Sequence, residues 1–290
     1  MYTSMTTTTF VRPYRISDIR DVCVFDLETT GVCVETARIV SGYAGRVTRD
    51  NEIQGEYNWL ANPGIPIPEG AAAVHGINDE MVKDAPSEAQ VTAEMVDVLS
   101  RSVARGRPIV GFNIAYDLSL LNNAARRHGI APIEDFGCVI DPLIIDKHVD
   151  KWRKGSRKLV DSAKYYGVPL DEDAAHDARN DALATGGVAW AVLNKLLTGN
   201  WEGDVTLENL HNLQVGWARD QQLDYQNYRR QGSKGRNGNP DKAPEPEFIL
   251  DPSWPIKVGE VTIATWREKR IAELAEQGIF VTPKVEDAAA

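Results

Sequence analysis

The 290-residue chain lacks any apolar run that approaches the roughly 20 residues a membrane-spanning helix needs. Its N-terminal stretch, MYTSMTTTTF, also lacks the basic segment followed by an apolar segment that marks a secretory signal. We therefore expect a cytoplasmic protein without membrane contact.

Cysteine is scarce, with only Cys23, Cys33 and Cys138 in the whole chain. All three lie in or beside apolar segments, and no two of them have the close spacing of a metal-binding pair. A small, odd number of cysteines argues against a disulfide-stabilised fold. We expect reduced thiols that pack in or near the core.

Positive charge is also in short supply, because 32 Lys and Arg face 42 Asp and Glu and the formal net charge is -10. Proteins that wrap nucleic acid nonspecifically place many Lys and Arg side chains on phosphates, so this composition argues against that class. It still permits a small site that reaches phosphates through metal ions. The content of 42% hydrophobic and 26% charged residues is typical of a globular domain.

Short apolar strands alternate with amphipathic helices between residues 19 and 200. Apolar runs and the turn residues between them predict five strands, near 22–27, 37–47, 52–62, 108–113 and 136–141. Helices are predicted from the N-cap Asn78 onward and over 87–105, 115–129, 158–167 and 177–197. We expect an α/β domain in which a central five-stranded mixed sheet, opened by an antiparallel hairpin, is flanked by helices.

The two ends of the chain differ from this domain in composition. Residues 1–18 are polar and predict a flexible tail. Residues 201–290 predict a C-terminal extension with a helix, a linker rich in Gly, Pro and charge at about 232–247, and a terminal helix. We assign the domain itself to residues 19–200.

The stretch FDLETTG places two carboxylates, Asp26 and Glu28, at the end of a strand that is otherwise apolar. Residues two apart on a strand point to the same face, so these side chains project together. Neighbouring carboxylates raise each other's pKa, and burying either one unpaired costs several kcal/mol. A cation between them removes both penalties. An isolated D-x-E pair more often faces solvent or nearby Lys and Arg, so the rest of the sequence must decide.

Further motifs, in order along the chain, favour the cation. FDLETTG resembles the first motif of the DEDD exonuclease superfamily, which includes the proofreading epsilon subunit of bacterial DNA polymerase III, ribonuclease T and oligoribonuclease. GFNIAYDLSLL is similar to the second motif, H-N-x-x-F-D, through Asn113 and Asp117. It departs from that motif at Phe112, where His is usual, and at Tyr116, where Phe is usual.

HDARNDALAT resembles the third motif, H-x-A-x-x-D-A, and its pairing of His176 with Asp181 is typical of the DEDDh branch. Five helical steps would turn His176 about 140° away from Asp181, so both can face one site only if the histidine precedes the helix. We therefore expect Asp177 to cap that helix. The resemblance spans residues 21–197 and implies a ribonuclease-H-like exonuclease fold.

The resemblance also implies two divalent ions, Mg²⁺ or Mn²⁺, held by carboxylate oxygens. Asp26 would contact both ions, Glu28 and Asp181 would complete the shell of one, and Asp117 would support the other. His176, neutral near pH 7, suits the general base that takes a proton from the attacking water. Two ions about 4 Å apart can activate that water and neutralise the leaving oxygen of a phosphodiester.

Other residues of the first two motifs are expected to bind the substrate. The backbone and hydroxyls of Thr29, Thr30 and Gly31 can contact the terminal nucleotide, with a plain turn as the alternative. Phe112 and Asn113 are assigned to the same group.

Two further segments are candidates for contact with the substrate. IPIPEGAAAVHGINDEMVKDAP is similar to a segment of epsilon-like members in which a His-Gly-Ile turn lies near the terminal nucleotide. His75 is thus expected either to line the nucleotide pocket or to serve as a turn residue. In the basic run KWRKGSRK we expect Lys154 and Arg157 to guide the phosphates of the strand and Trp152 to stack on a base. A solvated surface is the ordinary alternative for such a run.

Together these motifs predict a metal-dependent 3′–5′ exonuclease that releases nucleoside 5′-monophosphates from 3′ ends of DNA, in proofreading or repair. The His-Gly-Ile segment favours single-stranded DNA over RNA, whereas nothing in the metal site itself distinguishes deoxyribose from ribose. One alternative is an RNA-directed 3′–5′ exoribonuclease of the same superfamily. Another is a non-catalytic polymerase accessory subunit. The C-terminal extension is a candidate arm for a replication or repair protein.

Overall fold

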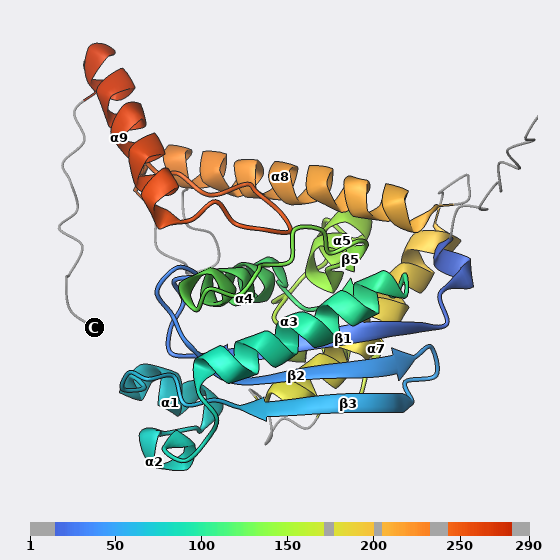
Figure 1. The fold of residues 1–290 in the computed structure, drawn as a ribbon. Helices are drawn as coiled ribbons and strands as arrows, with labels where there is room; N and C mark the ends of the chain where they lie inside the picture. Colours follow the sequence, from blue (N-terminus) through green and yellow to red (C-terminus); the bar gives the residue numbers. More distant parts are fainter. Residues whose placement is uncertain (1–14, 171–176, 200–204, 233–242, 280–290) are drawn as a thin grey trace, which may run out of the picture.

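The computed structural model describes residues 15–170, 177–199, 205–232 and 243–279. Within these ranges one sheet is formed by β1 (Asp21–Thr29), β2 (Ile39–Thr48), β3 (Ile53–Leu60), β4 (Ile109–Val110) and β5 (Val139–Ile140). The strand order is β3-β2-β1-β4-β5 (Figure 1). β1 pairs antiparallel with β2, as does β2 with β3, whereas the pairs β1–β4 and β4–β5 are parallel. The predicted mixed sheet with its opening hairpin is confirmed.

Helices cover both faces of this sheet (Figure 1). They are the short 3₁₀ helix η1 (Ile16–Asp18), α1 (Glu69–His75), α2 (Asp79–Val82), α3 (Glu88–Ala104), α4 (Ala115–Arg127), α5 (Pro142–Val149), α6 (Leu159–Tyr166), α7 (Ala178–Thr198), α8 (Leu207–Gln231) and α9 (Glu260–Glu276). In the described part of the chain, none of them is both long and apolar enough to cross a membrane.

The central strand β1 contributes to two hydrophobic layers. Phe25 and Leu27 pack with residues of α3 and α4 on one face. Val24 packs with residues of α7 on the opposite face. Because side chains alternate along a strand, Asp26 and Glu28 continue the second set and point to the side of the sheet that α7 covers.

Side-chain caps fix the starts of several helices. Asn78 accepts a hydrogen bond from the Met81 amide at the start of α2, and Asp177 accepts one from the Asn180 amide at the start of α7. Both are the caps that the sequence predicted. They satisfy amide groups that have no partner inside the first turn of a helix.

The sequence analysis missed α1 and α5. Residues of α1 follow a proline-rich loop, and their small side chains carry no clear helical pattern. α5 had a usable signal, because Asp141 caps it by accepting a hydrogen bond from the Leu143 amide and Pro142 occupies its first position.

The residues beyond 200, predicted as an extension of the domain, share its core. Leu207 and Leu210 of α8 belong to the hydrophobic cluster on the α7 side of the sheet. Ala218 of α8 and Trp254 belong to the cluster on the α3 and α4 side. The described part of the extension is therefore packed on the domain, and α8 runs along it as one long helix (Figure 1).

α8 lies against β5, the last strand of the sheet. There the Val139 amide donates a hydrogen bond to Nδ1 of His211, over 3.2 Å. Nδ1 therefore carries no proton in this contact, and the imidazole ring is neutral. Burial lowers the pKa of His211, although the nearby charge of Asp135 opposes this shift.

This contact makes a prediction about acid stability. A histidine whose pKa is lower in the folded state supports folding above its unfolded pKa of about 6.5 and loses that contribution as the pH falls below it. We expect His211→Asn, which retains an acceptor oxygen, to escape this loss. Denaturant unfolding at pH 7 and pH 5 should show a larger drop in unfolding free energy for the wild type than for the variant. Equal drops would contradict this role of the imidazole.

Candidate active site

The structure gathers the four predicted carboxylates at the end of β1. Asp26 and Glu28 are half-buried on the strand itself, and Asp181 lies in the first turn of α7, which packs on β1. Burial, followed by the charges of Asp117, Glu28 and Asp181, raises the pKa of Asp26 well above its usual range. Burial and then the charges of Asp181 and Asp117 raise the pKa of Glu28 to about 8. The charges of the neighbouring carboxylates therefore disfavour the ionised forms of Asp26 and Glu28.

Asp117 joins this cluster from the first turn of α4. Its side chain is 5% exposed, and its Oδ1 accepts a hydrogen bond from the Leu27 amide, over 3.1 Å. β4 pairs with β1 only at Cys23 and Val24, so the sheet does not use that amide on this side. Burial raises the pKa of Asp117 to about 8, although this backbone contact opposes the shift. Because β4 is short, the Leu27 amide of β1 is left to bind the carboxylate of Asp117.

The donor set fits a hard divalent cation, because carboxylate oxygens are the ligands that Mg²⁺, Mn²⁺ and Ca²⁺ prefer. Such a charge would favour the ionised form of each raised carboxyl group. Among the described residues, no three Asp, Glu, His or Cys side chains already meet in a metal-binding arrangement. The case for a metal in this cluster therefore rests on charge and ligand type.

The turn between β4 and α4 places the second motif. Asn113 has a positive φ of 59°, a left-handed conformation that Asn tolerates better than most residues. Its amide donates to the carboxylate of Asp141, over 3.1 Å. Phe112 is partly buried against the α7-side cluster. Phe112 and Asn113, both predicted to bind substrate, are thus also part of the turn that carries Asp117.

Asp141 is a residue of this region to which the sequence analysis gave no role. It is 1% exposed and follows β5 directly. Burial raises its pKa to about 6, although backbone hydrogen bonds from Asn113 and Leu143 oppose the shift. Its position, an acid between a buried strand and a proline, was the available signal.

The loop after β1 is held by its own hydroxyl groups. The Thr29 hydroxyl lies 2.8 Å from the Gly31 carbonyl and 2.6 Å from the Tyr116 hydroxyl, which also contacts that carbonyl. The buried Thr30 accepts a hydrogen bond from the Arg38 amide. In this structure the predicted substrate-binding hydroxyls of Thr29 and Thr30 therefore hold the turn. The hydroxyl of Tyr116, absent from the usual Phe, adds a link between this turn and α4.

His75 ends α1, at the end of the sheet where β1 also ends (Figure 1). Its Nδ1 accepts a hydrogen bond from the Ile77 amide, over 3.1 Å, across Gly76 with a φ of 74°. The turn role that the sequence allowed for His75 is therefore present. Its predicted place in a nucleotide pocket stays a prediction. His176, the predicted general base, lies outside the described residues.

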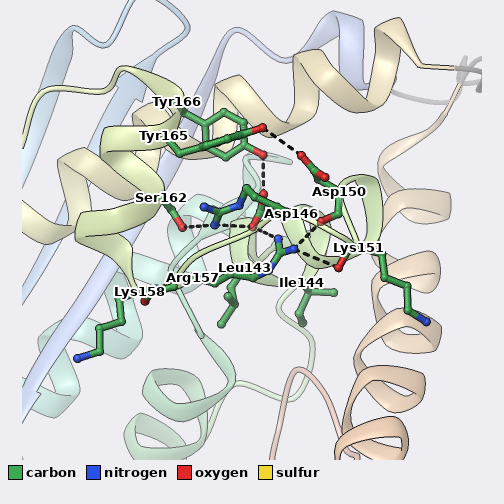
Figure 2. Close-up of polar contacts among 12 residues, drawn as sticks. Leu143, Ile144, Asp146, Asp150, Lys151, Arg157, Lys158, Ser162, Tyr165 and Tyr166 are labelled. Carbon is green, nitrogen blue, oxygen red and sulfur yellow. Dashed lines mark hydrogen bonds and ion pairs between the residues drawn. The ribbon is translucent and has the colours of Figure 1, made fainter. Parts of the chain in front are cut away.

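The basic segment divides into inward and outward residues. Figure 2 shows Arg157 directed at Asp146, with Tyr166 bonded to the same carboxylate. Arg153 also pairs with Asp146, over 3.0 Å, and that carboxylate is 1% exposed. In this structure Arg157 holds the loop to α5 by pairing with this buried acid, which is costly to bury without a cationic partner. Its expected contact with phosphates stays a prediction.

Lys154 of the same segment is exposed. Trp152 is 85% exposed. Their predicted contacts with a nucleic acid strand stay predictions. Both side chains lie on the outer side of the loop, whereas Arg153 and Arg157 bind Asp146 on its inner side.

The segment that carries the cluster matches a known family. Residues 23–188 match the model of RNase_T, an exonuclease family. DNA polymerase III PolC-type of Lacticaseibacillus paracasei is 32% identical over 184 residues, which is 62% of this chain and 12% of that protein. A DNA polymerase III subunit epsilon-like protein of Rhodobacter capsulatus is 33% identical over 165 residues, or 56% of this chain and 22% of that protein. The chain thus matches only a minor part of the length of these relatives.

Solved structures of exonuclease I share the fold. A zinc-bound complex of the E. coli enzyme with single-stranded DNA has a TM-score of 0.53 at 19% identity, covering 72% of this chain and 45% of that one. Another exonuclease I structure gives a TM-score of 0.51 at 19% identity, covering 71% of this chain and 46% of that one. These similarities confirm the predicted exonuclease fold.

The carboxylate cluster predicts a pH-dependent stability that metal reverses. Carboxyl groups with raised pKa values support folding below their unfolded pKa of about 4, and this support is lost as the pH rises through about 8. In chelator, the melting temperature should therefore contain a falling contribution between pH 5 and pH 8. Added Mg²⁺ or Mn²⁺ should raise it more at pH 8 than at pH 5. The fall of the melting temperature with pH should be smaller in Asp26→Asn than in the wild type. An equal rise of the melting temperature with metal at pH 5 and pH 8 would contradict this prediction.

The link between α4 and the loop after β1 is testable through Tyr116→Phe. Loss of the hydroxyl removes its contacts with Thr29 and Gly31, which should lower the unfolding free energy by about 1 kcal/mol. Tyr57→Phe, at an exposed tyrosine, is the control. Denaturant unfolding that finds no difference between the two variants would argue against the link.

Proposed function

Because the chain belongs to the exonuclease family, we propose that it removes nucleoside 5′-monophosphates from 3′ ends of DNA, using two divalent metal ions. The observation that carries the proposal is the carboxylate cluster. Asp26 and Glu28 lie at the end of β1, Asp117 accepts a hydrogen bond from the Leu27 amide of that strand, and Asp181 lies in the first turn of α7, which packs on β1. A nuclease role follows from the family. The direction of digestion, the sugar and the use of metal are our proposals.

The four carboxylates are the proposed metal ligands. Asp26 is the residue we assign to both ions, as its resemblance to the family's first motif implies. Glu28 and Asp181 are assigned to one ion and Asp117 to the other. Bound divalent ions would supply positive charge to the scissile phosphate and lower the pKa of a water molecule that attacks it.

His176 is the proposed general base. The third motif places it immediately before Asp177, which caps α7, and four residues before Asn180 in the turn that carries Asp181. A neutral imidazole accepts a proton near pH 7, whereas the carboxylates are expected to be occupied as ligands.

DNA is the proposed substrate because of the relatives. The names of two of them assign those proteins to DNA polymerase III, and a structural neighbour was solved with single-stranded DNA. RNA is the alternative, since the carboxylate cluster carries no contact that distinguishes the 2′ position. A replication or repair partner is proposed for α9, the helix that projects farthest from the sheet in Figure 1.

The proposal predicts the behaviour of charge-removing variants. Asp26→Asn and Asp181→Asn keep the side-chain size and remove a ligand charge, so each should abolish digestion. His176→Ala should reduce the rate ~10²-fold or more, the ordinary contribution of a general base. Asp97→Asn is the matched control, because that carboxylate is exposed and pairs with Arg101 on α3.

The measurement is a digestion of matched single-stranded DNA, duplex DNA and RNA, each labelled at the 5′ end, with Mg²⁺ and with chelator. A metal-dependent ladder that shortens from the 3′ end of DNA is the expected result. A ladder on RNA alone would favour the exoribonuclease alternative. Full activity in chelator or in either aspartate variant would overturn the metal mechanism, and a complete lack of digestion would favour a non-catalytic subunit.

A further inference from the structure

Gln214 of α8 lies beyond the segment that matches the exonuclease family, yet it contacts the sheet that carries the candidate site. Its side chain is fully buried, at 0% exposure. Oε1 accepts a hydrogen bond from the Asp141 amide over 2.7 Å, and Nε2 donates to the Val139 carbonyl over 2.8 Å. One side chain thus satisfies two backbone groups at the edge strand β5.

In the part of the chain that the structure describes, no further strand lies beside β5, so these backbone groups need other partners. A buried amide or carbonyl left unpaired costs roughly 1–3 kcal/mol. His211, one helical turn before Gln214, accepts from the Val139 amide and completes the arrangement. α8 therefore closes the edge of the sheet with side chains where another protein would use a strand.

Gln214 also fixes the start of a hydrogen-bonded path to the carboxylate cluster. The Asp141 backbone is held by Gln214, and the Asp141 Oδ1 accepts from the amides of Asn113 and Leu143, over 3.1 and 3.0 Å. Asn113 occupies the left-handed turn that precedes α4. Its carbonyl in turn accepts from the Tyr116 amide, over 3.1 Å.

The path ends at the second-motif carboxylate. Asp117 follows Tyr116 directly, and its Oδ1 accepts from the Leu27 amide of β1. The hydrogen bonds of this path span 2.7 to 3.1 Å, and Gln214, Asp141 and Asp117 are buried whereas Asn113 is exposed. A displacement of Asp141 would therefore move the turn that places Asp117, and a misplacement of about 1 Å in a catalytic group can cost 10²-fold in rate.

We propose that Gln214 is a positioning residue for the candidate active site, acting through Asp141 and Asn113 on the placement of Asp117. The C-terminal helix α8 is then part of the unit that performs the reaction. The ordinary alternative is that Gln214 only satisfies the sheet edge and contributes stability alone. The catalytic consequence rests on the proposed nuclease function, whereas the structural consequence does not.

The experiment compares Gln214→Met with Gln221→Met in the full chain. Both changes remove a glutamine amide of α8 that binds a backbone carbonyl, but Gln221 reaches Ile144 of α5, away from the path. Methionine preserves the length and volume of each side chain. The two variants thus share the loss of a hydrogen bond from a glutamine amide to a backbone carbonyl, and Gln214→Met alone also loses the contact with Asp141.

The first readout needs no catalysis. Amide hydrogen–deuterium exchange of the metal-free protein should speed up at least about tenfold in residues 111–118 of Gln214→Met, and stay at the wild-type rate there in Gln221→Met. Unchanged exchange in this segment of Gln214→Met would overturn the proposal, whether or not the protein proves to be a nuclease.

The second readout is kinetic and uses the DNA substrate that the wild type digests. At a temperature well below both melting points, Gln214→Met should lower kcat about tenfold or more with little change in KM, and Gln221→Met should leave both near the wild-type values. Equal kcat values in the two variants would assign Gln214 to stability alone.

Asp141 provides a second pair of variants if Gln214→Met does not fold. Asp141→Asn keeps the Oδ1 acceptor for both amides and should retain kcat within about threefold of the wild type, whereas Asp141→Ala removes the acceptor and should lose at least about tenfold. Comparable losses in both would show that the charge of Asp141 matters and would overturn a role through hydrogen-bonded positioning.

Discussion

The gathering of four carboxylates at one end of β1 is the constraint on which the rest of the structure depends. The pKa values of the carboxyl groups shift in opposite directions at the two ends of this strand. At its start, hydrogen bonds from Arg46 and Arg107 outweigh burial and lower the pKa of Asp21. At its end, burial and then the charges of neighbouring carboxylates raise the pKa values of Asp26 and Glu28. An arrangement so unfavourable in isolation is stable only in a fold that fixes it firmly, or in the company of added positive charge.

Local patterns predicted much of the fold and the candidate site. The alternation of β1 placed Asp26 and Glu28 on one face, and the helix geometry of the third motif located the cap at Asp177. Contacts between segments far apart in the chain could not be predicted from local sequence patterns. Arg157 looked like a surface cation because its partner Asp146 lies in α5, a helix that the sequence analysis did not find. The closing of β5 by α8 joins residues more than 70 positions apart.

The segment after residue 200 illustrates why a family boundary need not be a structural boundary. Trp254 is buried in the cluster under α3 and α4. Nearby, the Lys257 amide donates to the hydroxyl of Ser119, a buried residue of α4. α4 is thus held by β1 through Asp117 on one side and by the C-terminal segment on the other. Residues that share a core in this way unfold together more readily than apart.

The ion cluster around Asp146 separates the shape of its loop from the surface that the loop presents. Arg153 and Arg157 fix the backbone from inside, while Trp152 and Lys154 project outward without a part in that scaffold. Substitutions at the outward positions can therefore change what the surface attracts at little cost in folding, whereas substitutions of either arginine expose a buried acid. The shape of this loop and the chemical character of its outer face can therefore vary independently of each other.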